Sequence, residues 1–236
     1  MANKIQYSLF ILFFMLYLVC SGQQNELVIL HTNDTHSQIE PYQDKKRGEI
    51  GGYLRRYELI KQLKAENSNI LILDAGDFSQ GTPYFNLFKG FPEIEMMSKM
   101  GYRAVVLGNH EFDNGTKALA KRLKKASFDV VCANYTFKDK ALQKIVKPYI
   151  ILEINHLKIG IFGLTVNLEG LAFPEVMKQV EYHDAIEIAK KIVPYLKNEL
   201  KCDIIICLSH LGLDDKEGNP VNDIALAKAV DNINII

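Results

Sequence analysis

The fold is decided by the stretch Ala104-Val105-Val106-Leu107-Gly108-Asn109-His110-Glu111-Phe112-Asp113. Its first four residues are apolar, which is typical of a short buried strand, and Gly108 permits a turn at the strand end. The turn then presents an amide, an imidazole and a carboxylate. Asn109 offers a neutral oxygen to a hard cation, His110 offers a ligand or a proton donor, and Asp113 can hold the imidazole in one tautomer. Taken alone, the stretch is equally compatible with a structural turn.

Outward from this stretch, strand patterns alternate with helix patterns along the chain. Fully apolar strands between helices indicate a sheet covered on both faces, so we predict an α/β fold. A hairpin signature at Asn155-His156 predicts that the sheet is mixed. We expect strands at residues 27–30, 69–73, 103–107, 128–132, 203–208 and 233–236, and a long loop at 75–91. Helices are expected at 52–64, 92–101, 116–125, 182–200 and 221–230, with the fourth kinked or broken at Pro194.

Three other predicted strands are also followed by polar residues. In sheets of this kind, ligands bind beyond the carboxyl ends of the strands. Asp34 and His36 follow the first strand, and two residues apart in an extended segment they would point the same way and bind one cation together. Asp77 follows the second strand and His210 follows the strand at 203–208. Each residue alone is commonly a turn former or a structural histidine, but the four strand ends together predict one site.

Composition limits the classes of function. The chain has 236 residues, 48% of them hydrophobic and 24% charged, which suits one globular core. The net charge is zero, so nothing indicates nucleic acid or an acidic membrane surface as a partner. Cys132 and Cys207 lie in apolar runs and are expected to be small core residues instead of disulfide partners.

The N-terminus carries the pattern of an export signal. Lys4 precedes an apolar run at 9–19 that is shorter than a membrane helix, and small residues follow at Ser21 and Gly22. We therefore predict a signal peptide at 1–22 and a periplasmic or extracellular mature chain at 23–236. The alternative is a lipid anchor at Cys20, which would make the protein a membrane-anchored lipoprotein.

Taken together, four motifs resemble those of a known superfamily. They are Leu30-His31-Thr32-Asn33-Asp34-Thr35-His36, Gly76-Asp77, Gly108-Asn109-His110-Glu111-Phe112-Asp113 and Ser209-His210-Leu211-Gly212. The set resembles the calcineurin-like metallophosphoesterases, and within them the catalytic domain of the secreted 5'-nucleotidases. The resemblance implies a two-sheet mixed β-sandwich flanked by helices in four layers, with two divalent metals at the strand ends.

The resemblance also implies roles for individual residues. One metal would be bound by Asp34, His36 and Asp77, and the other by Asp77, Asn109 and His210. His110 and Asp113 would form the catalytic pair outside the metal ligands. The other histidines are predicted to lie outside the site, with His31 packed or bonded within its strand, His156 in the hairpin turn and His183 near a helix start.

This ligand set suits hydrolysis of a small-molecule phosphate ester, with nucleoside 5'-monophosphates as the expected substrates. Two divalent ions can activate a water as hydroxide and clamp the phosphoryl oxygens. They bring more positive charge than Asp34 and Asp77 return, which leaves the site attractive to a phosphate dianion. Mixed nitrogen and oxygen ligands favour zinc, manganese or iron over magnesium or calcium.

The sequence departs from the family pattern after residues 233–236. The family takes its last metal ligands from a Gly-His-x-His turn at this point, so we expect the last strand and metal loop to be missing and the chain to be truncated. A C-terminal nucleotide-binding domain is expected to be absent or separate. Alternatives within the fold are a 2',3'-cyclic nucleotide phosphodiesterase, a nucleotide-sugar hydrolase or a thiosulfohydrolase-like relative. An alternative of a different class is a non-catalytic fragment or binding module.

Overall fold

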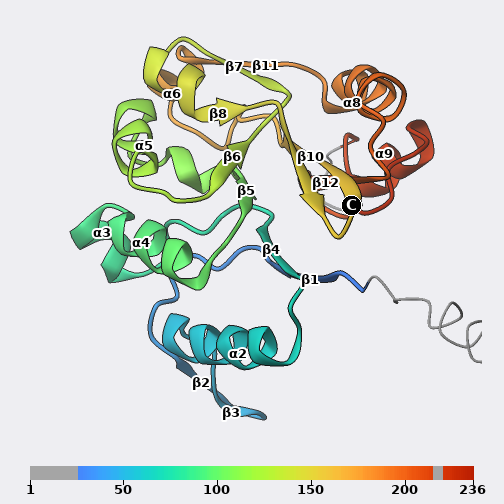
Figure 1. Ribbon diagram of the computed structural model, residues 1–236. Helices are drawn as coiled ribbons and strands as arrows, with labels where there is room; N and C mark the ends of the chain where they lie inside the picture. The colour runs from blue at the N-terminus through green and yellow to red at the C-terminus, as the bar shows by residue number, and fades with distance from the viewer. Residues whose placement is uncertain (1–25, 215–219) are drawn as a thin grey trace, which may run out of the picture.

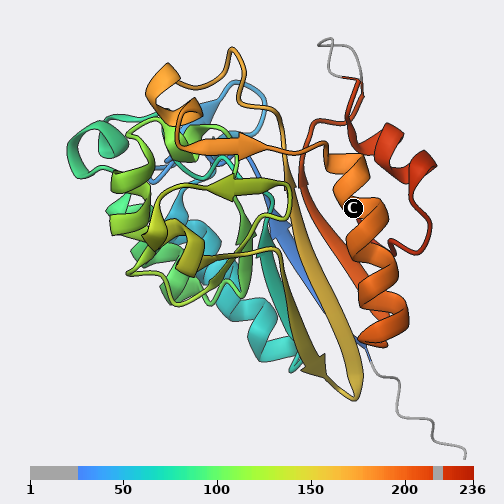
Figure 2. The ribbon, with the colours of Figure 1, turned by 90° about the horizontal axis from the view of Figure 1, so that it is seen from above.

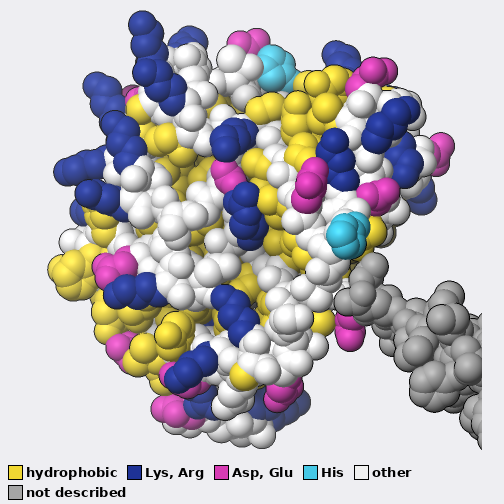
Figure 3. All heavy atoms as spheres, viewed as in Figure 1, with side chains coloured by type: hydrophobic (Ala, Val, Ile, Leu, Met, Phe, Trp, Pro, Cys, Tyr) yellow, Lys and Arg dark blue, Asp and Glu magenta, His cyan; other side chains and the backbone are white. Residues whose placement is uncertain are grey.

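The computed structural model describes residues 26–214 and 220–236. The predicted signal peptide at 1–22, with the alternative at Cys20, lies outside the described residues. Within the described ranges, the helices are too short or too polar to span a bilayer. Figure 3 shows one face of the molecule, on which basic and acidic side chains are interspersed.

The first sheet contains the strand that precedes the Gly108 turn. Among the described residues it has five strands, all parallel, in the order β1-β4-β5-β6-β8. Their bounds are Val28–Thr32, Ile70–Asp74, Ala104–Val106, Asp129–Val131 and Val146–Lys147. The first four were predicted as strands to within two residues at each end, and β8 was not predicted.

The second sheet is mixed. Strand β10 (Leu157–Thr165) pairs antiparallel with β9 (Tyr149–Ile154) and parallel with β12 (Ile204–His210). The predicted hairpin is confirmed: Asn155 and His156 connect β9 to β10 with φ angles of 50° and 65°, the left-handed pair that a two-residue turn requires. The segment predicted as a strand at 233–236 lies beside β12, where Ile235 forms a parallel bridge with Ile206.

The two sheets pack face to face. Gly163 of β10 lies at the closest approach, because a Cβ atom there would lie 2.4 Å from the carbonyl oxygen of Val131 on β6. The mixed sheet predicted from the hairpin is therefore the second sheet, while the first is purely parallel. The apolar layer between the sheets includes Leu71, Leu73, Ala104, Val106 and Val131 from the first sheet and Ile150, Leu152, Ile159, Ile161, Ile206 and Leu208 from the second.

Helices cover the outer face of each sheet (Figures 1 and 2). The first sheet is covered by α2 (Tyr53–Glu66), α4 (Phe91–Met100) and α5 (Thr116–Leu123), whose Ile60, Met97 and Leu119 join Val105 in one core cluster. The second sheet is covered by α8 (Ala185–Pro194) and α9 (Asp223–Ala229), whose Ala189 and Leu226 pack with Phe162.

Two of the predicted element bounds were wrong. The segment 75–91 is not a continuous loop, because Pro83 begins the short helix α3 (Pro83–Phe88). The helix predicted at 182–200 begins at Ala185 and changes to a π-helical turn, η2 (Tyr195–Glu199), directly after Pro194. Proline lacks the N–H that the α-helical ladder needs, which explains the change.

Several short elements were not predicted, because few residues in each carry a periodic pattern. They are β2 (Tyr42–Asp44), β3 (Gly48–Ile50), β7 (Tyr135–Phe137), β11 (Val180–Tyr182), α6 (Lys140–Ile145), α7 (Pro174–Met177) and the 3-10 turn η1 (His110–Phe112). Of these, η1 matters most for function, since it carries His110.

Candidate active site

Polar residues at the carboxyl ends of β1, β4, β5 and β12 line one cavity of about 1090 Å³, with His210 as the last residue of β12. The residues predicted as metal ligands all line it, together with His110: Asp34, His36, Asp77, Asn109 and His210. The predicted convergence of four strand ends is therefore present in the structure.

The backbone conformation of Asp34 and His36 differs from the extended one that was predicted. The segment is not extended, since both residues have left-handed backbones with φ angles of 50° and 41°. Their N–H groups donate to the carbonyl oxygens of Gly76 and Asp77, each at 3.0 Å, so the β4 loop holds the β1 loop in this conformation. Asp34 Oδ1 and His36 Nε2 are 3.7 Å apart. Such backbone strain is typical of functional sites.

Asp77 lies at the centre of the donor atoms. Its Oδ1 accepts a hydrogen bond from the His110 N–H at 2.9 Å, and its Oδ2 lies 3.2 Å from His210 Nε2. Two groups of donors can each hold a cation, with ligand atoms within 4.8 Å of one another. One contains His36, Asp77 and His110, and the other contains Asp34, Asp77 and His210. Asp77 belongs to both groups, in keeping with the bridging position that the resemblance implies, and the assignment of Asp34, His36, Asn109 and His210 to one metal or the other stays a prediction.

His210 is oriented by its second ring nitrogen. Nδ1 lies 2.8 Å from the carbonyl oxygen of Ala75, which can only accept, so Nδ1 carries the proton and Nε2 faces Asp77. Burial opposes protonation of His210, but the hydrogen bond and the charge of Asp77 raise its pKa to about 9. Carboxylate and imidazole donors that face one another in this way fit a divalent cation, which would replace the shared proton.

His110 and Asp113, which were predicted to be the catalytic pair, are in contact at η1. His110 Nδ1 lies 2.9 Å from Asp113 Oδ2. The His110 ring also meets the His36 ring edge-on, with centroids 5.2 Å apart. Burial lowers the pKa of His110, but the hydrogen bond to Asp113 and the nearby carboxylates raise it above its usual value overall. Asp113 therefore fixes the orientation of the ring and stabilises its charged form.

Glu111 lies within the motif at residues 108–113, but no role was predicted for it. Its carboxylate is fully buried and accepts hydrogen bonds from three backbone N–H groups: Asp77 at 2.9 Å, Ser79 at 3.0 Å and Gly108 at 2.7 Å. Buried Arg122 donates from Nη2 to the carbonyl oxygen of Glu111 at 2.5 Å. Glu111 thus joins the loop after β4 to the turn after β5. An acidic residue beside Phe112 in a buried turn was the only signal for it in the sequence.

The three histidines that were predicted to lie outside the site occupy different environments in the structure. The prediction for His31 was wrong: it is exposed and lines the cavity, because β1 is the edge strand of its sheet and one face of it is open there. His156 lies in the hairpin turn as predicted. His183 precedes α8, and its Nε2 lies 2.8 Å from the hydroxyl of Thr136.

The chain is similar to proteins of one family along most of its length. The pattern of the family described as calcineurin-like phosphoesterase matches residues 27–236. A 5'-nucleotidase of Vibrio cholerae is 37% identical over 212 residues, which cover 86% of this chain and 37% of that protein. A snake venom 5'-nucleotidase of Naja atra is 35% identical over 220 residues, which cover 89% of this chain and 40% of that protein.

Solved structures give a consistent result. The 5'-nucleotidase precursor from Thermus thermophilus superposes with a TM-score of 0.72 at 38% identity, covering 79% of this chain and 37% of that one. The NAD nucleotidase of Haemophilus influenzae gives a TM-score of 0.76 at 32% identity, covering 89% of this chain and 37% of that one. The chain thus spans about two fifths of the length of these relatives. It belongs to the calcineurin-like phosphoesterase family, a family of hydrolases, and its match lies with the 5'-nucleotidases.

Proposed function

We propose that this chain carries the site for metal-dependent hydrolysis of phosphate esters, with nucleoside 5'-monophosphates as substrates. The observation that carries the proposal is the position of Asp77. It belongs to both groups of cation donors and lies beside the His110–Asp113 pair in one cavity. The relatives named 5'-nucleotidase support the choice of substrate class.

Two divalent ions, of zinc, manganese or iron, are part of this proposal. The residues that would hold them are Asp34, His36, Asp77, Asn109 and His210, all of which line the cavity. When bound, such ions attract the phosphate and make a nucleophile available from water at neutral pH. The ligand types, imidazole nitrogen with carboxylate and amide oxygen, suit these transition metals.

His110 is proposed to protonate the leaving oxygen of the ester. Asp113 accepts the hydrogen bond from Nδ1, so the proton available to the substrate is the one on Nε2. The raised pKa of His110 increases the fraction of the ring that is protonated near neutral pH. Asp113 also stabilises the positive charge until the proton has been transferred.

Measurements of phosphate release test this function. We expect the full-length protein with added Mn²⁺ to release phosphate from AMP faster than from a 2',3'-cyclic nucleotide or a UDP-sugar, and to lose this activity with a chelator. Equal rates on all three compounds would favour a broader phosphodiesterase, and no release from AMP would reject the nucleotidase proposal.

Export is a separate proposal, supported by the signal pattern at residues 1–22. N-terminal sequencing of the mature protein would test it. A first residue of Gln23 is expected, whereas a modified Cys20 would indicate the lipid-anchored alternative, and an intact Met1 would contradict export.

A further inference from the structure

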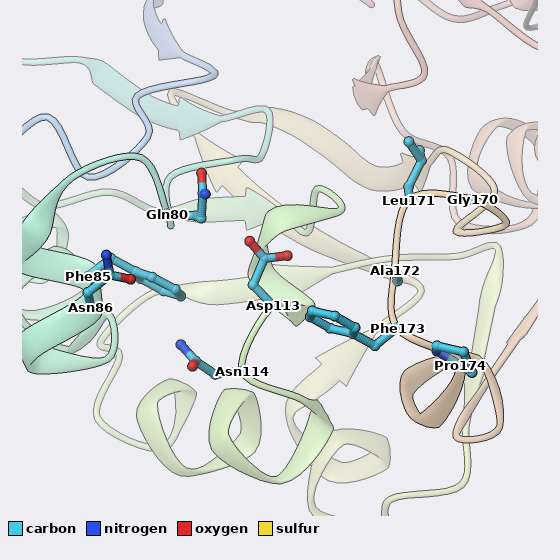
Figure 4. Close-up of a pocket in the computed structure, with 10 residues that line it drawn as sticks. All are labelled: Gln80, Phe85, Asn86, Asp113, Asn114, Gly170, Leu171, Ala172, Phe173 and Pro174. Carbon is cyan, nitrogen blue, oxygen red and sulfur yellow. The ribbon is translucent and has the colours of Figure 1, made fainter.

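The turn after β5, residues 107–114, lies between two hollows. Its Asn109 and His110 line the main cavity, whereas Asp113 and Asn114 line a second hollow of about 470 Å³ (Figure 4). On these two sides the turn meets open space, which provides no packing contacts. The turn is therefore held from inside the protein, and one of the groups that hold it belongs to the second sheet.

That group is the hydroxyl of Thr165, the last residue of β10. Thr165 is fully buried, and its Oγ1 donates to the carbonyl oxygen of Leu107 at 2.6 Å. The N–H of the same peptide unit belongs to Gly108 and donates to Glu111 Oε2 at 2.7 Å. Both polar groups of this peptide are thus bound, one by Thr165 and the other by Glu111. The next residue along the chain is Asn109.

Asn134, in the loop between β6 and β7, fixes the backbone of Thr165. It is fully buried, and its Oδ1 accepts the N–H of Thr165 at 2.9 Å. Its Nδ2 donates to the carbonyl oxygen of Thr165 at 2.7 Å. Because one planar amide makes both hydrogen bonds, the backbone of Thr165 has little freedom to rotate. The hydroxyl of Thr165 is therefore kept in place opposite Leu107.

Thr165 is also joined to a predicted metal ligand. In the parallel pairing of β10 with β12, Thr165 is the partner of His210. The N–H of Val166 donates to the carbonyl oxygen of His210 at 3.1 Å. Thr165 therefore connects the strand that carries His210 with the turn that carries Asn109.

The backbone of this turn has no space in which to adjust. A Cβ atom on Gly108 would overlap Asp77 Oδ1. A Cβ atom on Gly76 would lie 2.8 Å from the backbone nitrogen of Gly108 and 2.9 Å from His210 Nδ1. Groups packed this closely transmit a displacement instead of absorbing it. A shift of the peptide before Asn109 would therefore change the surroundings of the Asp77 carboxylate as well.

We propose that Thr165 is a positioning residue of the candidate metal centre. Its hydroxyl fixes the turn that carries Asn109 relative to the strand that carries His210, so that donors from the two sheets meet around Asp77. The inference rests on the proposed function, because it requires that divalent ions bind at these residues.

Titration of the metal-free, full-length protein with Mn²⁺ tests the proposal. Thr165→Val keeps the shape of the side chain but removes the donor to the carbonyl oxygen of Leu107. We expect the affinity of this variant for Mn²⁺ to fall about 10- to 100-fold, as for the loss of a group that orients metal ligands. Thr165→Ser retains the hydroxyl and should bind Mn²⁺ like the unmodified protein.

Ile161→Val is the matched control. Ile161 is fully buried on the same strand, and the change removes one methyl group from the apolar layer between the sheets. It should lower the melting temperature of the metal-free protein and leave the affinity for Mn²⁺ unchanged. An unchanged affinity in Thr165→Val would overturn the proposal, and so would an equal loss of affinity in Ile161→Val.

Amide hydrogen exchange gives a readout that requires no ion. In the metal-free protein, we expect the amides of residues 108–110 to exchange faster in Thr165→Val than in the unmodified protein, because the turn opens more easily. Thr165→Ser and Ile161→Val should exchange at the unmodified rate in this segment. Equal exchange in Thr165→Val and Ile161→Val would show that the hydroxyl does not hold the turn.

Asn134→Ala keeps the proposal testable if Thr165→Val does not fold. This variant releases the backbone of Thr165 but retains its hydroxyl. We expect the same two changes, weaker binding of Mn²⁺ and faster exchange at residues 108–110, each smaller than a complete loss of the hydroxyl would give. Results equal to those of Ile161→Val would overturn the proposal.

The outcomes also separate this inference from the proposed function. If the unmodified protein binds Mn²⁺ and hydrolyses AMP but Thr165→Val binds Mn²⁺ equally well, the inference fails and the proposed function stands. If the unmodified protein binds Mn²⁺ without hydrolysing AMP, the proposed function fails and the comparison of affinities still decides the role of Thr165. Absence of Mn²⁺ binding to the unmodified protein would reject both.

Discussion

Asp77 is the residue on which both candidate cation sites depend. Its backbone is left-handed, with a φ angle of 53°, and its N–H is held by Glu111. Burial opposes its ionisation, but His210 and His110 lower its pKa below the usual value of an aspartate overall. An ionised carboxylate is thus presented to the cavity in a fixed orientation.

Asp77→Asn should therefore weaken binding at both sites, because one carboxylate serves both groups of donors. We expect calorimetric titration with Mn²⁺ to show a loss of affinity for every bound ion. A variant that loses one ion and retains the other at full affinity would contradict a bridging role for Asp77.

His110→Asn should separate metal binding from proton transfer. The variant removes the imidazole that Asp113 orients, and loss of a general acid slows turnover by roughly 10²–10⁴-fold. The metal content measured after dialysis should stay unchanged. Loss of metal from the variant would show instead that His110 is a ligand, as its place beside His36 and Asp77 also allows.

The buried carboxyl group of Asp74 makes the stability of the folded protein depend on pH. It is fully buried, and burial raises its pKa to about 7 although it accepts hydrogen bonds from Thr32 and Gly76. Between about pH 4 and pH 7 the folded protein then binds more protons at this group than the unfolded chain does, so the stability contributed by Asp74 falls as the pH rises. It is fully present below about pH 4.

Asp74→Asn should remove this dependence. Relative to the unmodified protein, the melting temperature of the metal-free variant is expected to rise between pH 4.5 and pH 7.5. Thermal denaturation followed by circular dichroism measures it. A difference between the two proteins that stays constant over this range would show that Asp74 does not titrate there.

At the scale of elements, the segment from β5 through η1 to α5 works as one support for the site. Glu111 on η1 accepts the N–H groups of two loops, and Arg122 on α5 binds both Glu111 and the hydroxyl of Ser79. The buried carboxylate of Glu111 is tolerated because three backbone N–H groups donate to it. Through Arg122, helix α5 thus helps to position Glu111 and Ser79, which lie outside the helix.

Glu111→Gln should loosen both loops, because one amide oxygen replaces two acceptors and the new N–H groups face backbone donors. We expect a loss of about 1–3 kcal/mol in the free energy of unfolding, and an affinity for Mn²⁺ lower by about 10- to 100-fold in the folded variant. Glu95→Gln is the control, since Glu95 is exposed and pairs with Lys99 on the surface of α4. An unchanged metal affinity would limit Glu111 to a stabilising role.

At the scale of the whole molecule, the site depends on the contact between the two sheets. His210 comes from the second sheet, whereas Asp34, Asp77 and Asn109 follow strands of the first. Gly163 lies where the sheets are closest, with a Cβ position 2.8 Å from Val106. The spacing of the sheets therefore sets the distance between His210 and Asp77.

Gly163→Ala should push the sheets apart and destabilise the protein by about 1–3 kcal/mol, as overpacking does. Gly160→Ala on the same strand is the matched control, because its Cβ would meet the ends of the Cys202 and Leu196 side chains, which can move. Chemical denaturation measures both variants. Equal losses would mean that the spacing of the sheets is not limited by Gly163.

The sequence by itself determined the elements and the residue types at their ends. An apolar run such as 104–107, followed by glycine and polar residues, encodes a buried strand and its turn through interactions between close neighbours in the chain. This is why Asp77, Asn109, His110 and His210 could be predicted to share one edge of the fold. The hairpin at Asn155-His156 was predictable for the same local reason.

Only the tertiary structure decided how these residues are held. The left-handed backbone of Asp34 and His36 depends on carbonyl groups of the β4 loop, about forty positions away. Glu111 receives N–H groups from Asp77 and Ser79, which are 34 and 32 positions away. A local pattern contains no information about such partners, because these hydrogen bonds exist only once the strands have packed side by side.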